Sequence, residues 1–161
     1  MLSDKLQDAF NGQLNAEYYS SYLYLSMAAY FESKNLRGFA HWMGVQAKEE
    51  LGHAMKLYGH IHDRRGRVTL AAIDAPPTDW KSPLAAFEDA FKHEQKVTAM
   101  IAELVRKAAA DKDDAAGIFL QWFVTEQVEE EKQTDEIVHV LKMVGDSAQI
   151  LMLDAHLGKR E

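Results

Sequence analysis

Apolar side chains recur every three or four residues along most of this chain, which is the spacing of one face of an α-helix. The pattern predicts four long helices, at about residues 4–33, 35–65, 83–108 and 113–145, and a short fifth helix over about residues 146–157. On the first of these, the repeat passes through Leu6, Phe10, Leu14, Ser21, Leu25, Ala28 and Phe31. No stretch of any length alternates apolar and polar residues as a half-buried strand would, so the predicted fold class is all-α.

Residues with helix-capping chemistry mark the ends of the predicted helices. Asn35 can cap the second helix, and Gly66 follows its last turn. The pair at 82–83, serine then proline, is a cap followed by the helical position that favours proline. Either aspartate of 113–114 can cap the fourth helix, which then runs to Gly145. These signals support the boundaries that the apolar repeat predicts.

The three prolines of the chain, Pro76, Pro77 and Pro83, all lie around the link between the second and third helices. That link is about 17 residues long, whereas the links before the second and before the fourth helix are short. Short links join antiparallel neighbours, and a long link crosses the length of a bundle, so the second and third helices are expected to run parallel. The prediction is a single domain over residues 1–161: a four-helix bundle at about 4–145 with one long crossover, plus the short fifth helix.

Composition narrows the classes of function. The 161 residues are 47% hydrophobic, which is enough for one well-filled core. The formal net charge of −7 disfavours binding to nucleic acid or to an anionic membrane and favours cations as partners. The absence of cysteine excludes disulfides, iron–sulfur clusters and thiol catalysis. Neither a signal peptide nor a membrane span is visible, so a soluble cytoplasmic protein is expected.

Acidic residues occur where the helical pattern predicts a buried face. Glu17, Glu50 and Glu94 each lie near the middle of a predicted helix and on its apolar side, and residues 126–130 add carboxylates at the middle of the fourth helix. His53 follows Glu50 by three residues, so both side chains point the same way. Burying unpaired carboxylates is costly, and a bound cation is the simplest compensation. One such glutamate would ordinarily face solvent, but their coincidence at one level of four helices indicates a metal site.

The mixture of ligands indicates which metal. Carboxylates combined with an imidazole suit iron in both oxidation states. A carboxylate such as that of Glu50 can bridge two metal ions about 3.5–4 Å apart. Two adjacent Fe(II) ions can each give one electron to O2, and the surrounding negative charge stabilises the ferric product. The residues therefore predict a di-iron centre with Fe(II) and O2 as reactants.

Four stretches of the sequence carry a resemblance to a known family: residues 15–19 (NAEYY), 47–53 (AKEELGH), 91–94 (FKHE) and 121–131 (QWFVTEQVEEE). With them, the chain resembles a bacterial or archaeal non-haem ferritin over its full length. The resemblance implies a ferritin-like di-iron bundle, in which two helices each give a glutamate and the other two each give Glu-x-x-His. This chain departs from that pattern on the fourth helix, where Gln127 stands in place of the glutamate and Glu130 in place of the histidine. The departure is expected to weaken one metal position, so that iron passes through as a substrate.

By this resemblance, the first iron would be held by Glu17, Glu50 and His53. The second iron would be held by Glu50, Glu94 and Glu130, with a polar partner nearby in Gln127. Glu50 would thus belong to both positions and bridge the two ions.

The resemblance also implies residues at the edge of the di-iron centre. Glu49, Glu126 and Glu129 would form a third iron site, which shares Glu130 with the second. Tyr24 lies two helical turns beyond the glutamate of the first helix, so it faces the same way. In the family, this tyrosine forms a hydrogen bond at the centre and supplies an electron.

The function implied is iron storage by a ferroxidase, which oxidises Fe(II) with O2 or hydrogen peroxide and deposits a ferric oxyhydroxide core in a hollow shell. The helix at 146–157 has a large apolar face, which favours a homo-oligomer. By the resemblance, this homo-oligomer would be a closed shell of about 24 subunits. Haem is not expected, because Leu51 stands where bacterioferritin has its haem-binding methionine. The alternative is a discrete di-iron oxidoreductase, such as a rubrerythrin-like peroxidase, which stores no mineral. The missing second Glu-x-x-His motif and the absence of cysteine favour storage.

Overall fold

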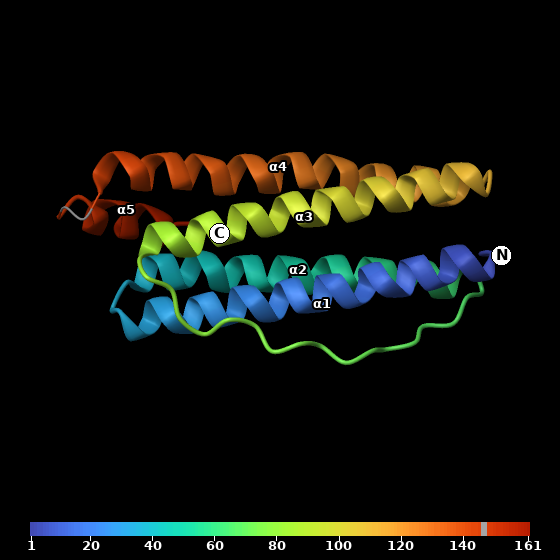
Figure 1. Ribbon diagram of the computed structural model, residues 1–161, viewed down its shortest axis with the longest axis horizontal. Coiled ribbons are helices and arrows are strands. Elements are labelled where there is room, and N and C mark those ends of the chain that lie inside the picture. Colours follow the sequence, from blue (N-terminus) through green and yellow to red (C-terminus); the bar gives the residue numbers. More distant parts are fainter. Residues whose placement is uncertain (146–147) are drawn as a thin grey trace.

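The computed structural model describes residues 1–145 and 148–161, which form a bundle of helices (Figure 1). The helices are α1 (Asp4–Ser33), α2 (Arg37–Asp63), α3 (Pro83–Ala110), α4 (Asp114–Val144) and α5 (Ile150–Leu157). The predicted all-α bundle with one long crossover and a short fifth helix is confirmed, although residues 146 and 147 of the predicted fifth helix lie outside the described residues. No helix in the described part of the chain has both the length and the apolar content to cross a bilayer.

The crossover between α2 and α3 is held along the outside of α1. Residues 66–82 contain neither helix nor strand, and Figure 1 shows them running the length of the bundle beside α1. Asn11 of α1 donates through Nδ2 to the Arg67 carbonyl at 3.0 Å and accepts from the Thr69 N–H at 2.8 Å. These bonds satisfy backbone groups that have no partner within secondary structure. The crossover returns the chain to the other end of the bundle, so α2 and α3 run parallel, as predicted.

Three of the long helices begin with a side-chain cap. Ser3, Ser82 and Asp113 each accept a hydrogen bond from the backbone N–H three residues ahead, at 3.2, 3.1 and 3.0 Å. Each bond satisfies one of the N–H groups that have no partner within the first turn of a helix. Ser82 is followed by proline at the first helical position, as the sequence predicts, and Asp113 rather than Asp114 is the cap of α4.

The start of α2 differs from the prediction. Asn35 is not its cap: with a φ of 59°, it lies in the preceding turn, and Leu36 occupies the cap position without a side-chain hydrogen bond. The missing bond comes from α5, where Asp154 accepts through Oδ1 from the Phe39 N–H at 3.0 Å. Gly38 permits this approach, because a Cβ there would lie 1.7 Å from the Asp154 carbonyl oxygen. The short C-terminal helix therefore caps α2 from a distance.

Gly66 follows the last turn of α2, as the sequence predicts, and its N–H bonds to the Ile61 carbonyl at 2.8 Å, while the left-handed residue of this turn is Arg65, with a φ of 57°. One sequence prediction for α1 is wrong in detail. Leu25 is predicted on the inner face of α1, yet its side chain is 56% exposed. The preceding residue, Tyr24, takes the inward position, because the buried stripe of a helix drifts from a strict four-residue step.

The hydrophobic core is divided in two by a band of buried polar side chains. The part toward α5 contains Phe31, Phe39 and Phe87, with ring centroids 5.0, 6.0 and 5.9 Å apart in pairs. The part toward the N-terminus contains Phe10 and Phe123. Between these parts along the helices are Gln13, Glu17, Ser20, Gln46, Glu50, His53, Glu94, Gln127, Glu130 and Thr134. The bundle thus gathers its buried polar groups at one level, between two apolar layers.

Candidate metal centre

The first cluster of potential metal ligands joins α1 to α2. Glu17, Glu50 and His53 are all buried, and each offers a ligand atom within 4.8 Å of those of the other two. His53 Nδ1 lies 3.3 Å from Glu50 Oε2 and 3.9 Å from Glu17 Oε2. The three-residue spacing of Glu50 and His53 turns both side chains to one side of α2. The structure therefore brings together the three residues predicted for the first iron.

The second cluster spans α2, α3 and α4. Glu50, Glu94 and Glu130 are buried, and their carboxylates offer oxygens within 4.8 Å of one another. These are the residues predicted for the second iron. Because Glu50 belongs to both clusters, the two sets overlap in one carboxylate, which is the arrangement that a bridging ligand requires.

Two buried glutamines that the sequence prediction missed hold these carboxylates in place. Gln13 donates through Nε2 to Glu17 Oε1 at 2.7 Å, and Gln46 donates through Nε2 to Glu50 Oε1 at 2.8 Å. Gln46 also donates to Glu130 Oε2 at 2.6 Å, which links α2 to α4. Each glutamine lies about one helical turn before its glutamate. This Gln-x-x-x-Glu spacing, repeated on α1 and α2, was the signal available in the sequence.

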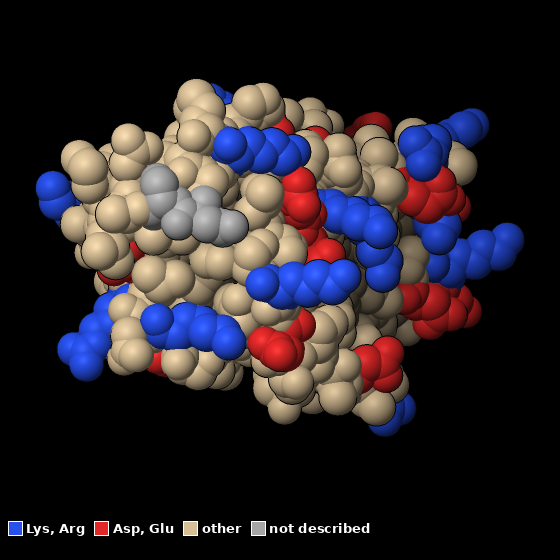
Figure 2. All heavy atoms as spheres, turned by 60° about the vertical axis from the view of Figure 1, so that its left-hand side comes forward, with Lys and Arg blue, Asp and Glu red and all other residues tan. Residues whose placement is uncertain are grey.

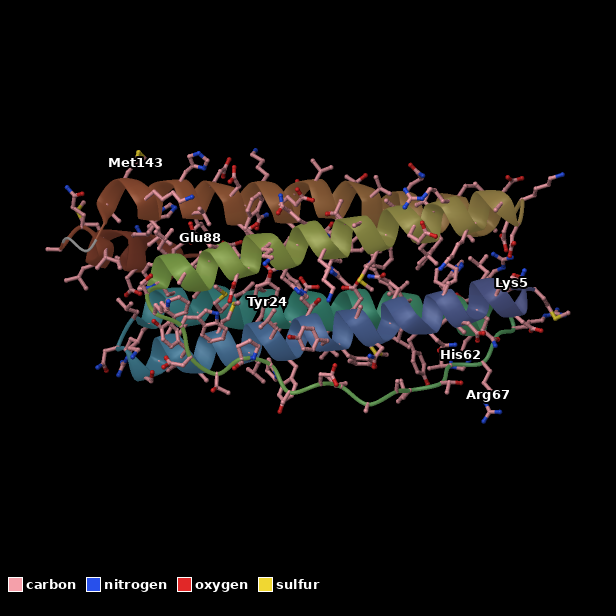
Figure 3. The ribbon with its side chains drawn as sticks, in the orientation of Figure 1. Lys5, Tyr24, His62, Arg67, Glu88 and Met143 are labelled. Atoms are coloured by element: carbon pink, nitrogen blue, oxygen red, sulfur yellow. The ribbon has the colours of Figure 1, made fainter. Side chains whose placement is uncertain are left out.

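Glu94 receives hydrogen bonds from two other helices. The Tyr24 hydroxyl donates to Glu94 Oε1, and Gln127 donates through Nε2 to Glu94 Oε2 at 3.1 Å. Tyr24 is completely buried, and Figure 3 shows it between α1 and α3. Gln127 also lies 3.3 Å from the Thr98 hydroxyl. Tyr24 and Gln127 are thus polar neighbours of the second cluster, in the positions that the sequence prediction gives them.

Burial and mutual repulsion raise the pKa values of the clustered carboxyl groups. Burial, and then repulsion from Glu94, raises the pKa of Glu50 to about 8. Burial, and then repulsion from Glu50 and Glu94, raises the pKa of Glu130 to about 9. The pKa values of Glu17 and Glu94 are also raised, chiefly by burial. A metal-free centre therefore holds protons near neutral pH, and a bound cation would displace them.

Two buried oxygen atoms at the centre have no hydrogen-bond partner: Oε2 of Glu17 and Oε1 of Gln46. An unsatisfied buried acceptor costs about 1–3 kcal/mol, and more when it is charged. A cation in the first cluster would satisfy the Glu17 oxygen directly. Carboxylate oxygens with one imidazole suit iron, and two ions held side by side can pass electrons together to a bound oxidant.

The residues predicted for a third iron site lie at the edge of the centre and are not all close together. Glu126 is partly buried, and with His53 and Glu130 it offers ligand atoms within 4.8 Å of one another. Glu129 is exposed, and Glu49, whose side chain is 42% exposed, is engaged in an ion pair with the C-terminal segment. Within residues 1–145 and 148–161, neither Glu49 nor Glu129 belongs to a cluster of three acidic or histidine ligands.

Comparison with known protein families and sequences gives matches along nearly the whole chain. A family model described as a ferritin-like domain matches residues 7–144. A bacterial non-haem ferritin of Bacteroides fragilis is 48% identical over 160 residues, which cover 99% of this chain and 100% of the relative. A bacterial non-haem ferritin of Staphylococcus aureus is 40% identical over 161 residues, which cover 99% of this chain and 97% of the relative.

Solved structures of ferritins from the archaeon Archaeoglobus fulgidus share the fold. One, described as a novel open pore ferritin from this hyperthermophile, matches with a TM-score of 0.98 and 51% identity, covering 99% of this chain and 98% of that one. A mutant ferritin from the same organism matches with a TM-score of 0.95 and 51% identity over the full length of both chains.

Proposed function

This chain belongs to the ferritin family, and on that premise we propose that it stores iron, as a ferroxidase that oxidises Fe(II) with O2 or hydrogen peroxide at a di-iron centre and deposits a ferric oxyhydroxide core. The observation that carries the proposal is the overlap of two buried ligand clusters in the single carboxylate of Glu50. One metal ion would need only one of these clusters. Two clusters that share a ligand fit a pair of adjacent ions.

In this proposal, Fe(II) is the substrate. Glu17 and His53 bind the first ion, Glu94 and Glu130 bind the second, and Glu50 bridges them. The shared carboxylate keeps the ions about 3.5–4 Å apart, so each can give one electron to the same O2 molecule. Gln13 and Gln46, through their hydrogen bonds, fix the orientations of the carboxylates before the metal arrives.

Tyr24 is proposed to act beside the second ion. Its hydroxyl already donates a hydrogen bond to Glu94 Oε1. If Tyr24 supplies an electron to the reduction of the oxidant, its proton has an acceptor in that carboxylate. The burial of Tyr24 and the neighbouring carboxylates raise its pKa, so the phenol stays protonated until that step.

The ligand set favours passage of iron over its retention. His53 is the only imidazole in the two inner clusters, and the second cluster contains carboxylates alone. Gln127 and Glu130 stand where a second Glu-x-x-His motif would add a carboxylate and an imidazole, so the second position holds an ion less firmly than two complete motifs would. We propose that Glu49, Glu126 and Glu129 take up a third ion at the edge of the centre, on the way between the inner pair and the mineral.

A shell is supported by apolar side chains left exposed near α5. Met143, Leu151 and Met152 are 77%, 62% and 75% exposed, and Figure 3 shows Met143 pointing away from the bundle. Figure 2 shows a largely uncharged area in its upper left, on this side of the molecule. Two other apolar residues of α5, Leu153 and Leu157, are already buried within the subunit. A closed homo-oligomer of about 24 subunits would cover the exposed residues.

The proposal is tested by loading the purified protein with Fe(II) without oxygen, admitting air, and measuring particle mass and iron content by analytical ultracentrifugation and elemental analysis. The expected result is a closed shell that retains far more iron per subunit than its ligand clusters can bind. A Glu50→Ala shell serves as the control and should assemble while oxidising iron slowly.

The same measurement separates storage from the alternative function. A discrete di-iron oxidoreductase would sediment as a monomer or dimer with two irons per subunit and no mineral. That result would contradict the storage proposal while leaving the di-iron centre intact.

A further inference from the structure

The residues that follow α5 lie back along α2 and end beside the candidate metal centre. Figure 1 marks the C-terminus nearer the middle of the bundle than α5 itself. The return starts where α5 meets the beginning of α2: a Cβ added at Gly158 would lie 3.3 Å from the Cα of Gly38. From there, Arg160 extends to the part of α2 that carries Glu49.

Arg160 is fixed in this position by four contacts with α2. Its guanidinium donates to Glu49 Oε2 and, through Nη1, to the Trp42 carbonyl at 3.3 Å. The same guanidinium lies over the Trp42 ring, with Cζ 4.3 Å from the ring centroid. The carbonyl oxygen of Arg160 lies 2.7 Å from His41 Nε2. The Arg160 side chain is only 15% exposed, so this is a packed contact and not a loose surface pair.

Arg160 pairs with a residue that adjoins the candidate metal centre, Glu49. Glu49 directly precedes Glu50, the carboxylate shared by the two inner clusters. A guanidinium keeps its charge at every physiological pH, so it remains paired with Glu49 whatever the protonation of the centre. A metal ion can bind Glu49 Oε2 fully only if it displaces the guanidinium from that oxygen. In the structure, Glu126 forms a cluster with His53 and Glu130, whereas Glu49 is held by Arg160.

We propose that Arg160 is a tethered counter-ion that competes with metal ions for Glu49 and thereby weakens the third iron position relative to the two inner positions. The inference rests on the proposed function, because that position is part of the proposed path of iron. With the centre empty, Arg160 compensates the charge of Glu49 beside the other carboxylates. When the two inner positions are filled, a third ion binds only if Arg160 moves away from Glu49. The third position is therefore the last to fill and the first to empty.

The test is calorimetric titration of the full-length shell with Zn(II), which binds without redox chemistry. The variant Arg160→Gln removes the charge and keeps most of the stem, Arg160→Lys keeps the charge, and Lys159→Gln is the matched control, since Lys159 is exposed one residue away. Loss of a partly exposed charge pair of this kind should change the affinity for the third Zn(II) ion by about three- to tenfold. We expect Arg160→Gln to bind the third Zn(II) tighter by that factor, with the other two variants close to wild type.

An unchanged or weaker third affinity in Arg160→Gln would overturn the inference. A second readout uses the wild-type protein alone: crystals soaked in rising Zn(II) should show Arg160 displaced in those where Glu49 holds an ion. An ion on Glu49 with Arg160 still paired to it would contradict the competition, even if the variants fail to assemble. Fewer than two tight Zn(II) ions in wild type would instead contradict the proposed di-iron function.

Discussion

The two inner clusters of the candidate metal centre share Glu50 but differ in their other potential ligands and in their hydrogen bonds. The first adds Glu17 and His53, and it leaves Oε2 of Glu17 buried without a partner. The second adds Glu94 and Glu130, whose carboxylates accept hydrogen bonds from Tyr24, Gln127 and Gln46. One cluster therefore has an imidazole and an unsatisfied oxygen, while the other has oxygens only, and most of them are already hydrogen-bonded.

This difference indicates a division of roles within one centre. An imidazole ligand favours transition metals over Mg²⁺ and Ca²⁺, and the unsatisfied oxygen gains a partner when an ion binds. The first cluster should therefore fill first. In the second cluster an arriving ion competes with hydrogen bonds that already stabilise the carboxylates, so its affinity should be lower and its exchange faster.

Replacing the shared ligand should have the largest effect. Glu50→Ala removes a ligand from both clusters, so rapid Fe(II) oxidation should fall by more than about a hundredfold, equivalent to several kcal/mol of transition-state stabilisation. Stopped-flow absorbance after mixing Fe(II) with O2 measures the rate of this oxidation. Glu103→Ala, an exposed glutamate on α3, is the control and should match wild type. A wild-type oxidation rate in Glu50→Ala would contradict the assignment of both clusters.

Replacing an unshared ligand should affect one cluster and spare the other. His53→Ala should weaken the tighter of two Zn(II) ions by about 10–100-fold, whereas Glu94→Ala should weaken the looser one by a similar factor. Calorimetry with each variant, without iron or oxygen, separates the two steps. If both variants weaken the same step, the division between the clusters is wrong.

The raised carboxyl pKa values predict how stability without metal depends on pH. The folded-state pKa of Glu130 is about 9, above its value of 4.5 in an unfolded chain, so folding takes up a proton between these limits. Its contribution to stability is complete below pH 4.5 and is lost as the pH rises toward 9, by at most about 1.4 kcal/mol per unit. The neutral variant Glu130→Gln escapes this loss. With chelator present, its Tm at pH 8 should exceed that of wild type by about 2–4 °C per kcal/mol recovered.

The comparison that checks this prediction is the same pair of proteins at pH 5, where the difference in Tm should shrink. Added Zn(II) at pH 8 should stabilise wild type more than Glu130→Gln, because the variant has lost a ligand. If Glu130→Gln is less stable than wild type at pH 8 without metal, burial and the neighbouring carboxylates do not destabilise the ionised Glu130, and the prediction is wrong.

Residues at the edge of the centre should have the smallest effect on the rate. Glu126→Ala and Glu129→Ala remove proposed ligands of the third ion but none of the residues of the second cluster. The first rapid phase of oxidation should stay within about twofold of wild type, while the ratio of iron oxidised to O2 consumed changes. An oxygen electrode measures that ratio. Complete loss of the rapid phase in Glu129→Ala would mean that Glu129 belongs to an inner metal position and has been wrongly assigned to the third one.

Much of the fold and of the candidate ligand clusters could be predicted from sequence because the signals are local. A repeat of apolar residues every three or four positions predicts each long helix, and a proline-rich link of extended length predicts the crossover. Glutamates in phase with the apolar faces are conspicuous because a buried charge is costly. Those signals identify Glu17, Glu50, His53 and Glu94 without knowledge of the packing.

The parts that escaped prediction depend on contacts between distant segments. The cap of α2 comes from Asp154, more than a hundred residues away, so the nearby Asn35 was the wrong choice. Gln13 and Gln46 carry no charge. Burying a neutral amide costs less than burying a carboxylate, so a glutamine on an apolar face is a weaker signal of a site than a glutamate. The pairing of Arg160 with Glu49 arises only because α5 docks on α2, which no local pattern shows.

The central claim, that two clusters sharing Glu50 hold two adjacent ions, is tested most directly by anomalous diffraction from crystals soaked in Fe(II) without oxygen. The account predicts two iron peaks per subunit, about 3.5–4 Å apart, with the Glu50 carboxylate between them. Glu17 and His53 should ligate one ion, and Glu94 and Glu130 the other. A single iron, or two irons that do not share Glu50, would contradict it.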